Sequence, residues 1–461
     1  MNDHLRVPRL NWHTDMPEGR SPFCKHETRA LKVTLHSSGL KGLSDNEQEA
    51  YELLLALLKL PDFEVLQFEE GFFPQIQWVL GDSEYDGIHI DYVDGGWRKN
   101  GINLGQVKRL AATDDRCSKL YQNFLSLEAH SELNQDIFVS GSADILAIRD
   151  DHDSYNIRTP SESLRIVGLL LRSRDNWAYG YQGNCVWNAD RRRFYWTIMR
   201  SKLPAMWKYH AECREAGGFE GALTGLVSSV MERCYTLTQV VDELGKEFFG
   251  DGDHEVILYH FNYFSLLASG VLDALARITH DVYQLGGSKN SAGFNLDRRV
   301  KFSKDLQSKA PALHSVVSAS ENAALINLIH SLRNTIHGAG HTTQREASTT
   351  SNTHVILSSE VGNEIWKYGQ SIGCNDFVGL TRRHCESYSI NGIDQGSKTE
   401  FIVEPYNFST FVLERAFKLV NAIAENTDIA VQKNLPVREH AMPGDWKEPA
   451  RRFEMLGGFH G

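Results

Sequence analysis

The sequence lacks the short motifs that mark several large enzyme classes. It contains no GxxxxGK[ST] phosphate loop, no GxGxxG after an expected strand, no GxSxG nucleophile turn and no HExxH zinc motif. These absences argue against a P-loop NTPase, a Rossmann dehydrogenase, an α/β-hydrolase and a zinc protease of the HExxH type.

Cysteine is sparse, and long apolar runs are missing. The seven cysteines are scattered and form no CxxC pair, which argues against a zinc ribbon and a thioredoxin-type site. Their odd number favours a reducing compartment. No apolar run approaches the roughly 18 residues that span a bilayer, and the N-terminal stretch lacks an apolar signal segment. We therefore expect a cytoplasmic protein with no membrane partner.

Positive charge is also in deficit. Lys and Arg total 48 against 59 Asp and Glu, so the formal net charge is −11. A general nucleic-acid coat protein would carry the opposite sign. Hydrophobic residues make up 41% of the 461 residues and charged residues 23%, as in a globular protein. At about 100–200 residues per domain, this length predicts two to four domains.

The N-terminal patterning predicts mixed structure. A capping box from Ser44 to Glu47 predicts the start of a helix that runs to about Lys59. Short β-branched and aromatic stretches separated by turn residues predict strands around it. These expected strands lie at 30–35, 64–68, 76–80 and 87–93.

Helical periodicity dominates after Thr159-Pro160, where a proline at the first position favours a helix start. Helices are expected at 222–249, 255–285, 318–337 and 409–426, with short strands at 354–357 and 400–403. The Gly-Asp repeat at 250–253 predicts a linker. The fold class is therefore mainly α with a minor α+β N-terminal region. The expected divisions are 1–157 (mixed α+β), 158–250 (helical), 251–435 (helical with short strands) and 436–461 (a loose tail).

The expected helix ending at His337 carries an unusual set of polar residues. An apolar stripe along it predicts a buried face, and a second stripe lies about 100° away around the helix. The apolar stripe is Leu325, Ile329, Leu332 and Ile336, and the second is Ile326, His330, Arg333 and His337. Asn334 lies close to this second stripe. Gly338 and Gly340 follow, as is typical of helix ends.

This residue set suits chemistry on an RNA phosphodiester. Arg333 stays charged and can bind a phosphate through several donors. His337 carries an imidazole ring, which can accept and donate a proton. Asn334 can orient either partner through hydrogen bonds. Such a scheme needs neither a metal nor a cofactor, and we assign none.

The stretch Leu332-Arg333-Asn334-Thr335-Ile336-His337-Gly338 resembles the arginine–asparagine–histidine signature of the HEPN (higher eukaryotes and prokaryotes nucleotide-binding) superfamily. The resemblance covers about residues 255–345. It implies a helical bundle and an endoribonuclease of a bacterial or phage-defence or toxin type, often a homodimer. It also implies that a polar residue of the preceding long helix faces the arginine, and Asp273 is the candidate.

The spacing of this motif departs from the family pattern. Three residues separate Arg333 from His337 and seven separate it from His341, whereas the family usually has four to six. Three alternatives to cleavage therefore stay open. They are an RNA-binding domain without catalysis, a helical scaffold that binds a protein partner, and a metal-dependent hydrolase that uses His330, His337 and His341.

Local charge supports a polyanion partner. Residues 286–345 hold eight Lys and Arg against three acidic residues, a net charge of +5 within a chain of −11. A basic patch can bind RNA locally even on an acidic protein. The candidate substrate-binding residues are Arg298, Arg299, Lys301 and His341.

A second basic and aromatic stretch lies at 191–196. Arginines beside aromatic rings are typical of single-strand binding sites. The favoured interpretation is an ordinary element whose aromatic side chains enter the core.

Overall fold

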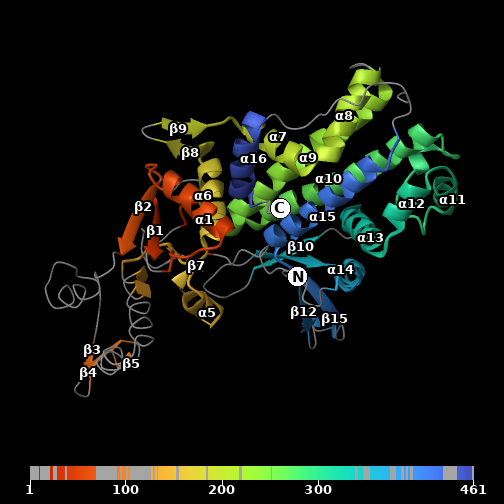
Figure 1. Ribbon diagram of the computed structural model, residues 1–461. Coiled ribbons are helices and arrows are strands. Elements are labelled where there is room, and N and C mark those ends of the chain that lie inside the picture. The colour runs from red at the N-terminus through yellow and green to blue at the C-terminus, as the bar shows by residue number, and fades with distance from the viewer. Residues whose placement is uncertain are drawn as a thin grey trace. The chain divides into compact units, whose positions relative to one another are not determined.

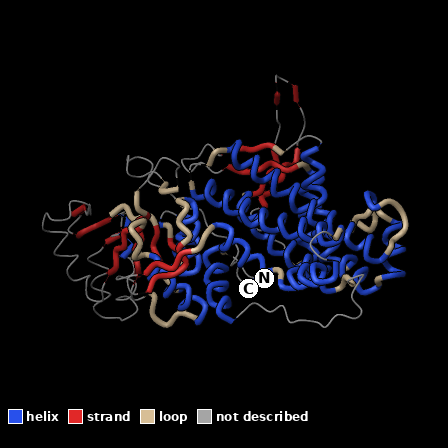
Figure 2. Tube along the Cα trace, turned by 90° about the horizontal axis from the view of Figure 1, so that it is seen from above, coloured by secondary structure: helices blue, strands red, loops and turns tan. Residues whose placement is uncertain are grey.

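The fold was obtained as a computed structural model. It describes residues 10, 21–23, 29–36, 39–68, 91–93, 96–99, 102–103, 126–127, 130–131, 133–151, 155–182, 185–217, 221–250, 252–337, 341–345, 353–373, 380–385, 389–390, 393–394, 398–428 and 444–458. The described chain is mostly helical, as the periodicity predicts (Figures 1 and 2). It divides into two compact units, which are taken separately below.

The α/β unit consists of the described residues within Pro8–Ala189 and Met455–Gly461. Its strands are β1 (Leu31–His36), β2 (Phe63–Phe68), β3 (Asp91–Val93), β4 (Gly96–Lys99), β5 (Ile102–Asn103), β6 (Ile137–Val139), β7 (Ile157–Arg158), β8 (Ala178–Gln182) and β9 (Cys185–Asn188). Its helices are α1 (Asp45–Leu57), α5 (Ala143–Asp151) and α6 (Pro160–Ser173). The strand expected at 76–80 and the first half of the one at 87–93 lie outside the described residues.

The sheet of this unit corrects the expected α+β arrangement. Its order is β2-β1-β6-β7, and all three strand pairings are parallel. Each parallel crossover needs a connection over the sheet, and α1 makes the one from β1 to β2. This sheet therefore has the α/β arrangement, whereas β3-β4-β5 and β8-β9 of the same unit pair antiparallel. The error arose because short apolar runs predict strands without showing the direction in which they pair.

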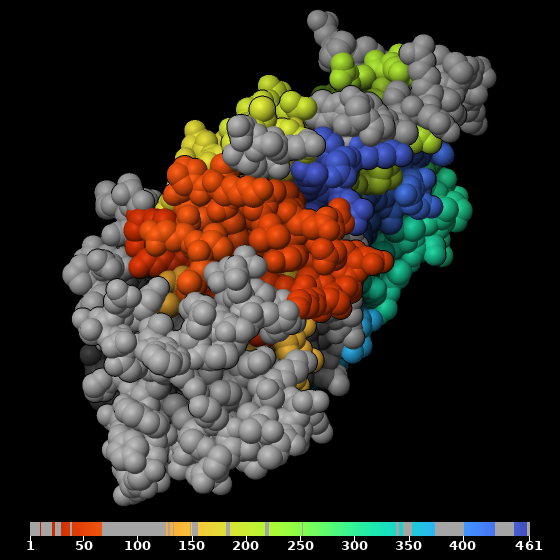
Figure 3. Space-filling view, turned by 60° about the vertical axis from the view of Figure 1, so that its left-hand side comes forward, coloured from red at the N-terminus to blue at the C-terminus, as the bar shows by residue number. Residues whose placement is uncertain are grey.

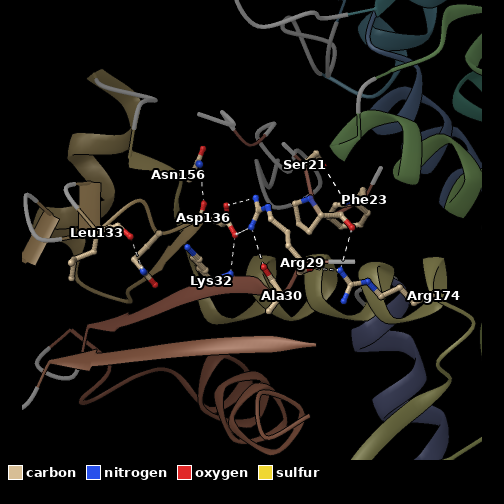
Figure 4. A network of polar contacts seen from close by, with 11 residues as sticks. Ser21, Phe23, Arg29, Ala30, Lys32, Leu133, Asp136, Asn156 and Arg174 are labelled. Carbon is tan, nitrogen blue, oxygen red and sulfur yellow. Dashed lines mark hydrogen bonds and ion pairs between the residues drawn. The ribbon is translucent and has the colours of Figure 1, made fainter. Parts of the chain in front are cut away.

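A polar network joins the amino ends of three strands of this sheet (Figure 4). Arg29 contacts both carboxylate oxygens of Asp136, at 2.7 and 2.8 Å. One of these oxygens also accepts the backbone N–H of Lys32 in β1, at 2.8 Å. Asn156, just before β7, donates to the backbone carbonyl of Asp136 at 2.9 Å. Because the Asp136 carboxylate is almost buried and fully hydrogen-bonded, we assign this network a structural role.

The helix α1 begins where expected, but its cap differs. Ser44 has the extended backbone of an N-cap, yet its side chain makes no capping hydrogen bond. Glu47 instead accepts from the backbone N–H and the hydroxyl of Ser161, at 3.0 and 2.7 Å. The expected capping box at 44–47 is therefore wrong, because its carboxylate is used by the start of α6. The surface of residues 39–66, which includes α1, is orange in Figure 3.

At the start of α6 the expected cap is present in full. The Thr159 side chain accepts from the Glu162 N–H, and the Glu162 carboxylate accepts from the Thr159 N–H. Glu162 also pairs with Arg149 of α5 at 3.0 Å. The start of α6 is thus held by local hydrogen bonds, as the Thr-Pro pattern predicts.

The helical unit consists of the described residues within Asp190–Glu454. Its helices are α7 (Arg191–Lys202), α8 (Pro204–Gly217), α9 (Ala222–Phe249), α10 (His254–Tyr283), η4 (Lys289–Ser291), α11 (Val300–Lys309), α12 (Pro311–Ser318), α13 (Ser320–His337), α14 (Ser359–Ser371), α15 (Pro405–Glu425) and α16 (Gly444–Gly457), whose last three residues belong to the other unit. Its strands are β10 (Thr342–Arg345), β11 (Thr353–Leu357), β12 (Leu380–Cys385), β13 (Ser389–Ile390), β14 (Ile393–Asp394) and β15 (Lys398–Val403).

The long helices α9 and α10 form the centre of this unit. They pack along each other, and α15 packs against both (Figure 1). Gly252 in the turn between them has φ of 64°, in the left-handed region that favours glycine. Asp253 then caps α10 by accepting two backbone N–H groups. The expected domain boundary at 250–253 therefore lies inside one unit, and the division falls at 189/190 instead.

The C-terminal expectation also needs correction. The sequence predicts a loose tail over 436–461, but α16 covers Gly444–Gly457. Phe453 of α16 is fully buried and its ring lies 5.0 Å from that of Phe194. The helix was missed because Pro449 lies inside it and its apolar residues are few.

Candidate functional site

The site is built where α13 crosses α10. Leu325, Ile329 and Leu332 are buried, which confirms the predicted core face, whereas Ile336 at its end is half-buried. The neighbouring stripe becomes more exposed along the helix. Ile326 is buried, His330 and Arg333 are half-buried, and His337 is exposed. The polar residues of α13 therefore lie at the margin between core and surface.

Arg333 and Asp273 meet, as the resemblance implies. Nη1 of Arg333 lies 3.2 Å from Oδ2 of Asp273 on α10. Their side chains are 38% and 29% exposed, so the pair is open to solvent. A guanidinium has five N–H donors, and this contact uses one of them. The remaining donors have no acceptor among the described residues and can bind an oxyanion.

His330 lies beside this ion pair. The sequence predicts it on the polar stripe and as a metal ligand in one alternative, but not among the catalytic residues. Its Nδ1 is 3.4 Å from Oγ of Ser269, and its Nε2 is buried without a hydrogen-bond partner among the described residues. Burial lowers the pKa of His330, and Arg333 lowers it further, while Asp273 opposes the shift. The ring is therefore neutral at neutral pH. Its position on the polar stripe, between Ile326 and Arg333, was the available signal.

Two of the predicted basic residues lie near His330. Arg298 and Arg299 are exposed, and both are near enough to His330 for their charges to lower its pKa. They lie in the turn that precedes α11, where the Arg299 N–H donates to the carbonyl of Leu296. Lys301 is also exposed on α11. Three arginines, Arg298, Arg299 and Arg333, thus lie near His330.

Asn334 and His337 are both exposed on α13. His337 comes one turn after Arg333, so the two side chains are neighbours on the helix surface. Neither Asn334 nor His337 makes a hydrogen bond to Arg333 in the described part of the chain. The structure thus leaves both free to contact a ligand.

His341 is placed differently from the expectation. It is only 4% exposed, and its ring lies 5.4 Å from that of Phe261 in an edge-on arrangement. Burial lowers its pKa to about 4. The predicted substrate-binding role is wrong for this residue, because a buried ring packed on an aromatic side chain cannot reach a surface ligand.

The described histidines form no cluster of the kind that holds a metal ion. In the described ranges, no group of three or more His, Cys, Asp or Glu side chains is arranged to hold a metal ion. Within the same ranges, no helix is both long enough and apolar enough to cross a bilayer.

The aromatic residues of 191–196 enter the core, as the favoured interpretation predicts. Phe194 and Tyr195 are 2% exposed, and the Tyr195 hydroxyl donates to the buried Asp242 at 2.7 Å. Trp196 stacks on Tyr235 with ring centroids 5.4 Å apart. These rings are therefore occupied by protein contacts.

Comparisons with protein-family models, with curated proteins and with solved structures find no match to this chain. The function is therefore inferred from the geometry of the site and from the α13 motif.

Proposed function

We propose that this protein binds RNA and cleaves it without a metal at the group formed by Asp273, His330, Arg333, Asn334 and His337. The observation that carries the proposal is the solvent-open ion pair of Arg333 with Asp273, 3.2 Å apart, beside a histidine and further arginines. The resemblance of the α13 motif to the HEPN superfamily supports the same reaction.

The chemistry follows from the accessible groups. Arg333, steadied by Asp273, would hold a phosphate oxygen and stabilise charge on the crowded phosphorus. His337 would take the proton of the ribose 2′-hydroxyl as the 2′-oxygen bonds to phosphorus. The bond between phosphorus and the 5′-oxygen would then break to leave a 2′,3′-cyclic phosphate, and the protonated His337 would return its proton to the departing 5′-oxygen. Asn334 would orient the substrate through its amide.

The test is cleavage of end-labelled single-stranded RNA in EDTA. Wild type should cleave the RNA, whereas Arg333→Ala and His337→Ala should cleave it about a hundredfold or more slowly. Lys367→Ala is the matched control, because it removes an exposed positive charge on α14. If wild type leaves every RNA intact, or if the two variants cut as fast as the control, catalysis at this site is rejected.

Asp273→Asn separates positioning from charge. The amide keeps the shape of the side chain but removes the anion that opposes the fall in the pKa of His330. We expect that pKa to fall further in Asp273→Asn, as measured by NMR titration of the ring protons. An unchanged pKa would show that Asp273 does not act on His330.

A further inference from the structure

The amino-terminal half of α10 exposes an apolar stripe. Tyr259 is 63% exposed, Tyr263 37% and Leu266 38%, which is unusual for large hydrophobic residues. The two tyrosine rings are nearly parallel, at 24°, with centroids 6.1 Å apart. The two exposed rings thus stack along the same stripe.

This stripe continues into the candidate site. At about 100° per residue, Tyr259, Tyr263, Leu266, Gly270, Asp273 and Arg277 all lie within about 80° around the helix axis. Tyr259 and Asp273 are separated by about 21 Å along α10. One face of α10 therefore carries aromatic rings at its start and the partner of Arg333 near its end.

Gly270 brings another positive charge onto this face. Nη1 of Arg233, from α9, donates to the Gly270 carbonyl at 2.7 Å. A Cβ at position 270 would lie 3.4 Å from Nε of Arg233, which is ordinary contact distance, so the guanidinium lies directly against the helix surface at this position. Arg277 is exposed one turn beyond Asp273. Arginines thus flank Asp273 on both sides.

We propose that this face, which we name the α10 face (Tyr259, Tyr263, Leu266, Gly270 with Arg233, Asp273 and Arg277), binds single-stranded RNA and leads it to Arg333. The inference rests on the proposed function. Unpaired bases stack on Tyr259 and Tyr263, and the arginines contact phosphates. A duplex hides the faces of its bases, so the α10 face selects unpaired strands.

The charge distribution favours RNA over a second copy of this chain. The carboxyl end of the α10 face joins three arginines, from α9, α10 and α13, with two acidic residues, Asp273 and Asp281, and Asp281 pairs with Lys289. At its amino end the same face carries the exposed Glu255. A second copy carries a net charge of −11 spread over many acidic and basic groups and offers no regular series of phosphates. A single strand supplies both stacking bases and regularly spaced negative charge.

The experiment measures binding of a fluorescent 2′-O-methyl oligonucleotide, which cannot be cut through its 2′-oxygen. We expect the double variant Tyr259→Ala with Tyr263→Ala to bind about tenfold or more weakly than wild type. The matching double Phe variant keeps both aromatic faces and should bind as wild type does. Trp366→Ala, which removes a 49% exposed ring on α14, is the control for loss of an exposed aromatic. A 2-aminopurine base in the strand should be quenched by wild type and not by the double Ala variant.

Three outcomes overturn the α10 face as an RNA site. The first is a double Ala variant that binds the oligonucleotide as tightly as wild type does. The second is a duplex of the same sequence that binds as tightly as the single strand and depends on the two tyrosines to the same extent. The third is a wild-type dimer, seen by light scattering, that the double Ala variant converts to monomers, since the face is then covered by a second copy.

The two proposals fail separately. If the single strand binds through Tyr259 and Tyr263 but its unmodified form is never cut, cleavage is rejected and the α10 face stands. If RNA is cut in a manner that depends on Arg333 but not on the tyrosines, the α10 face is rejected and the proposed function stands.

Discussion

Individual thiols in this protein differ in their surroundings. Cys185 is exposed, whereas Cys213 and Cys234 are buried. Burial raises the pKa of both buried thiols to about 12. The thiolate is the reactive form of cysteine, so both the access and the ionisation of the buried pair are restricted.

We therefore expect iodoacetamide to label Cys185 much faster than Cys213 or Cys234 in the native protein at mildly alkaline pH. Peptide mass spectrometry over time measures the three rates. Labelling in guanidinium is the control and should bring the rates close together. Native labelling of Cys234 at the rate of Cys185 would contradict the burial of α9.

At this scale the sequence predicts the candidate site in part. The contact of Asp273 with Arg333 follows from the resemblance and is present in the structure. The place of His330 beside this pair, and the burial of His341 against Phe261, depend on how α10 and α13 cross and on where the chain turns after α13. Helical periodicity gives the face of a residue on its own helix but not the neighbouring element.

Some helices are held together by polar contacts that no local sequence pattern predicts. Glu47 of α1 accepts two hydrogen bonds from Ser161, at the amino end of α6, although the residues are far apart in sequence. A carboxylate near a helix N-terminus is also favoured by the helix dipole. The same residue looked like a local cap in the sequence, because the capping pattern is satisfied by spacing alone.

Glu47→Ala should lower the free energy of unfolding by about 1–3 kcal/mol, since it removes two charge-assisted hydrogen bonds at the start of α6. Urea unfolding followed by circular dichroism measures this change. Glu52→Ala is the control, because Glu52 is exposed on the same helix and bonds only to Gln48 within the described residues. Equal effects of the two substitutions would show that the Ser161 contact contributes nothing.

Helix positions were the most predictable part of the fold. The expected helices at 222–249, 255–285 and 318–337 are confirmed as α9, α10 and α13, with ends shifted by only a few residues. Long amphipathic runs with clear caps specify such helices locally. The parallel sheet was not predictable in the same way, because pairing of β1 with β6 joins segments about a hundred residues apart.

For the whole molecule, buried histidine makes stability depend on pH. In the unfolded chain His341 titrates near its ordinary pKa of about 6.5, whereas in the folded protein its pKa is about 4. At pH values between about 4 and 6.5, His341 is protonated in the unfolded chain and neutral in the folded protein. The contribution of the neutral His341 ring to the free energy of unfolding is therefore fully present above about pH 6.5 and is lost as the pH falls towards 4.

This residue alone should remove about 3 kcal/mol from the free energy of unfolding as the pH is lowered through that range. Urea unfolding at a series of pH values measures the slope. His341→Leu keeps an apolar side chain against Phe261 and lacks the titrating group, so its slope should be smaller. Identical slopes for wild type and His341→Leu would show that the ring is accessible to protons in the folded state.

The α/β unit has a consequence for biosynthesis. Arg172 of α6 donates to the carbonyl of Leu456 at 3.0 Å, and Gly458 lies so close to Arg165 that a Cβ there would collide with its side chain. Both arginines are buried. The ribosome synthesises residues 8–189 long before residues 455–458. Until those last residues are made, Arg165 and Arg172 of the α/β unit cannot form their contacts with Gly458 and Leu456. Completion of this unit therefore waits until the helical unit has been synthesised.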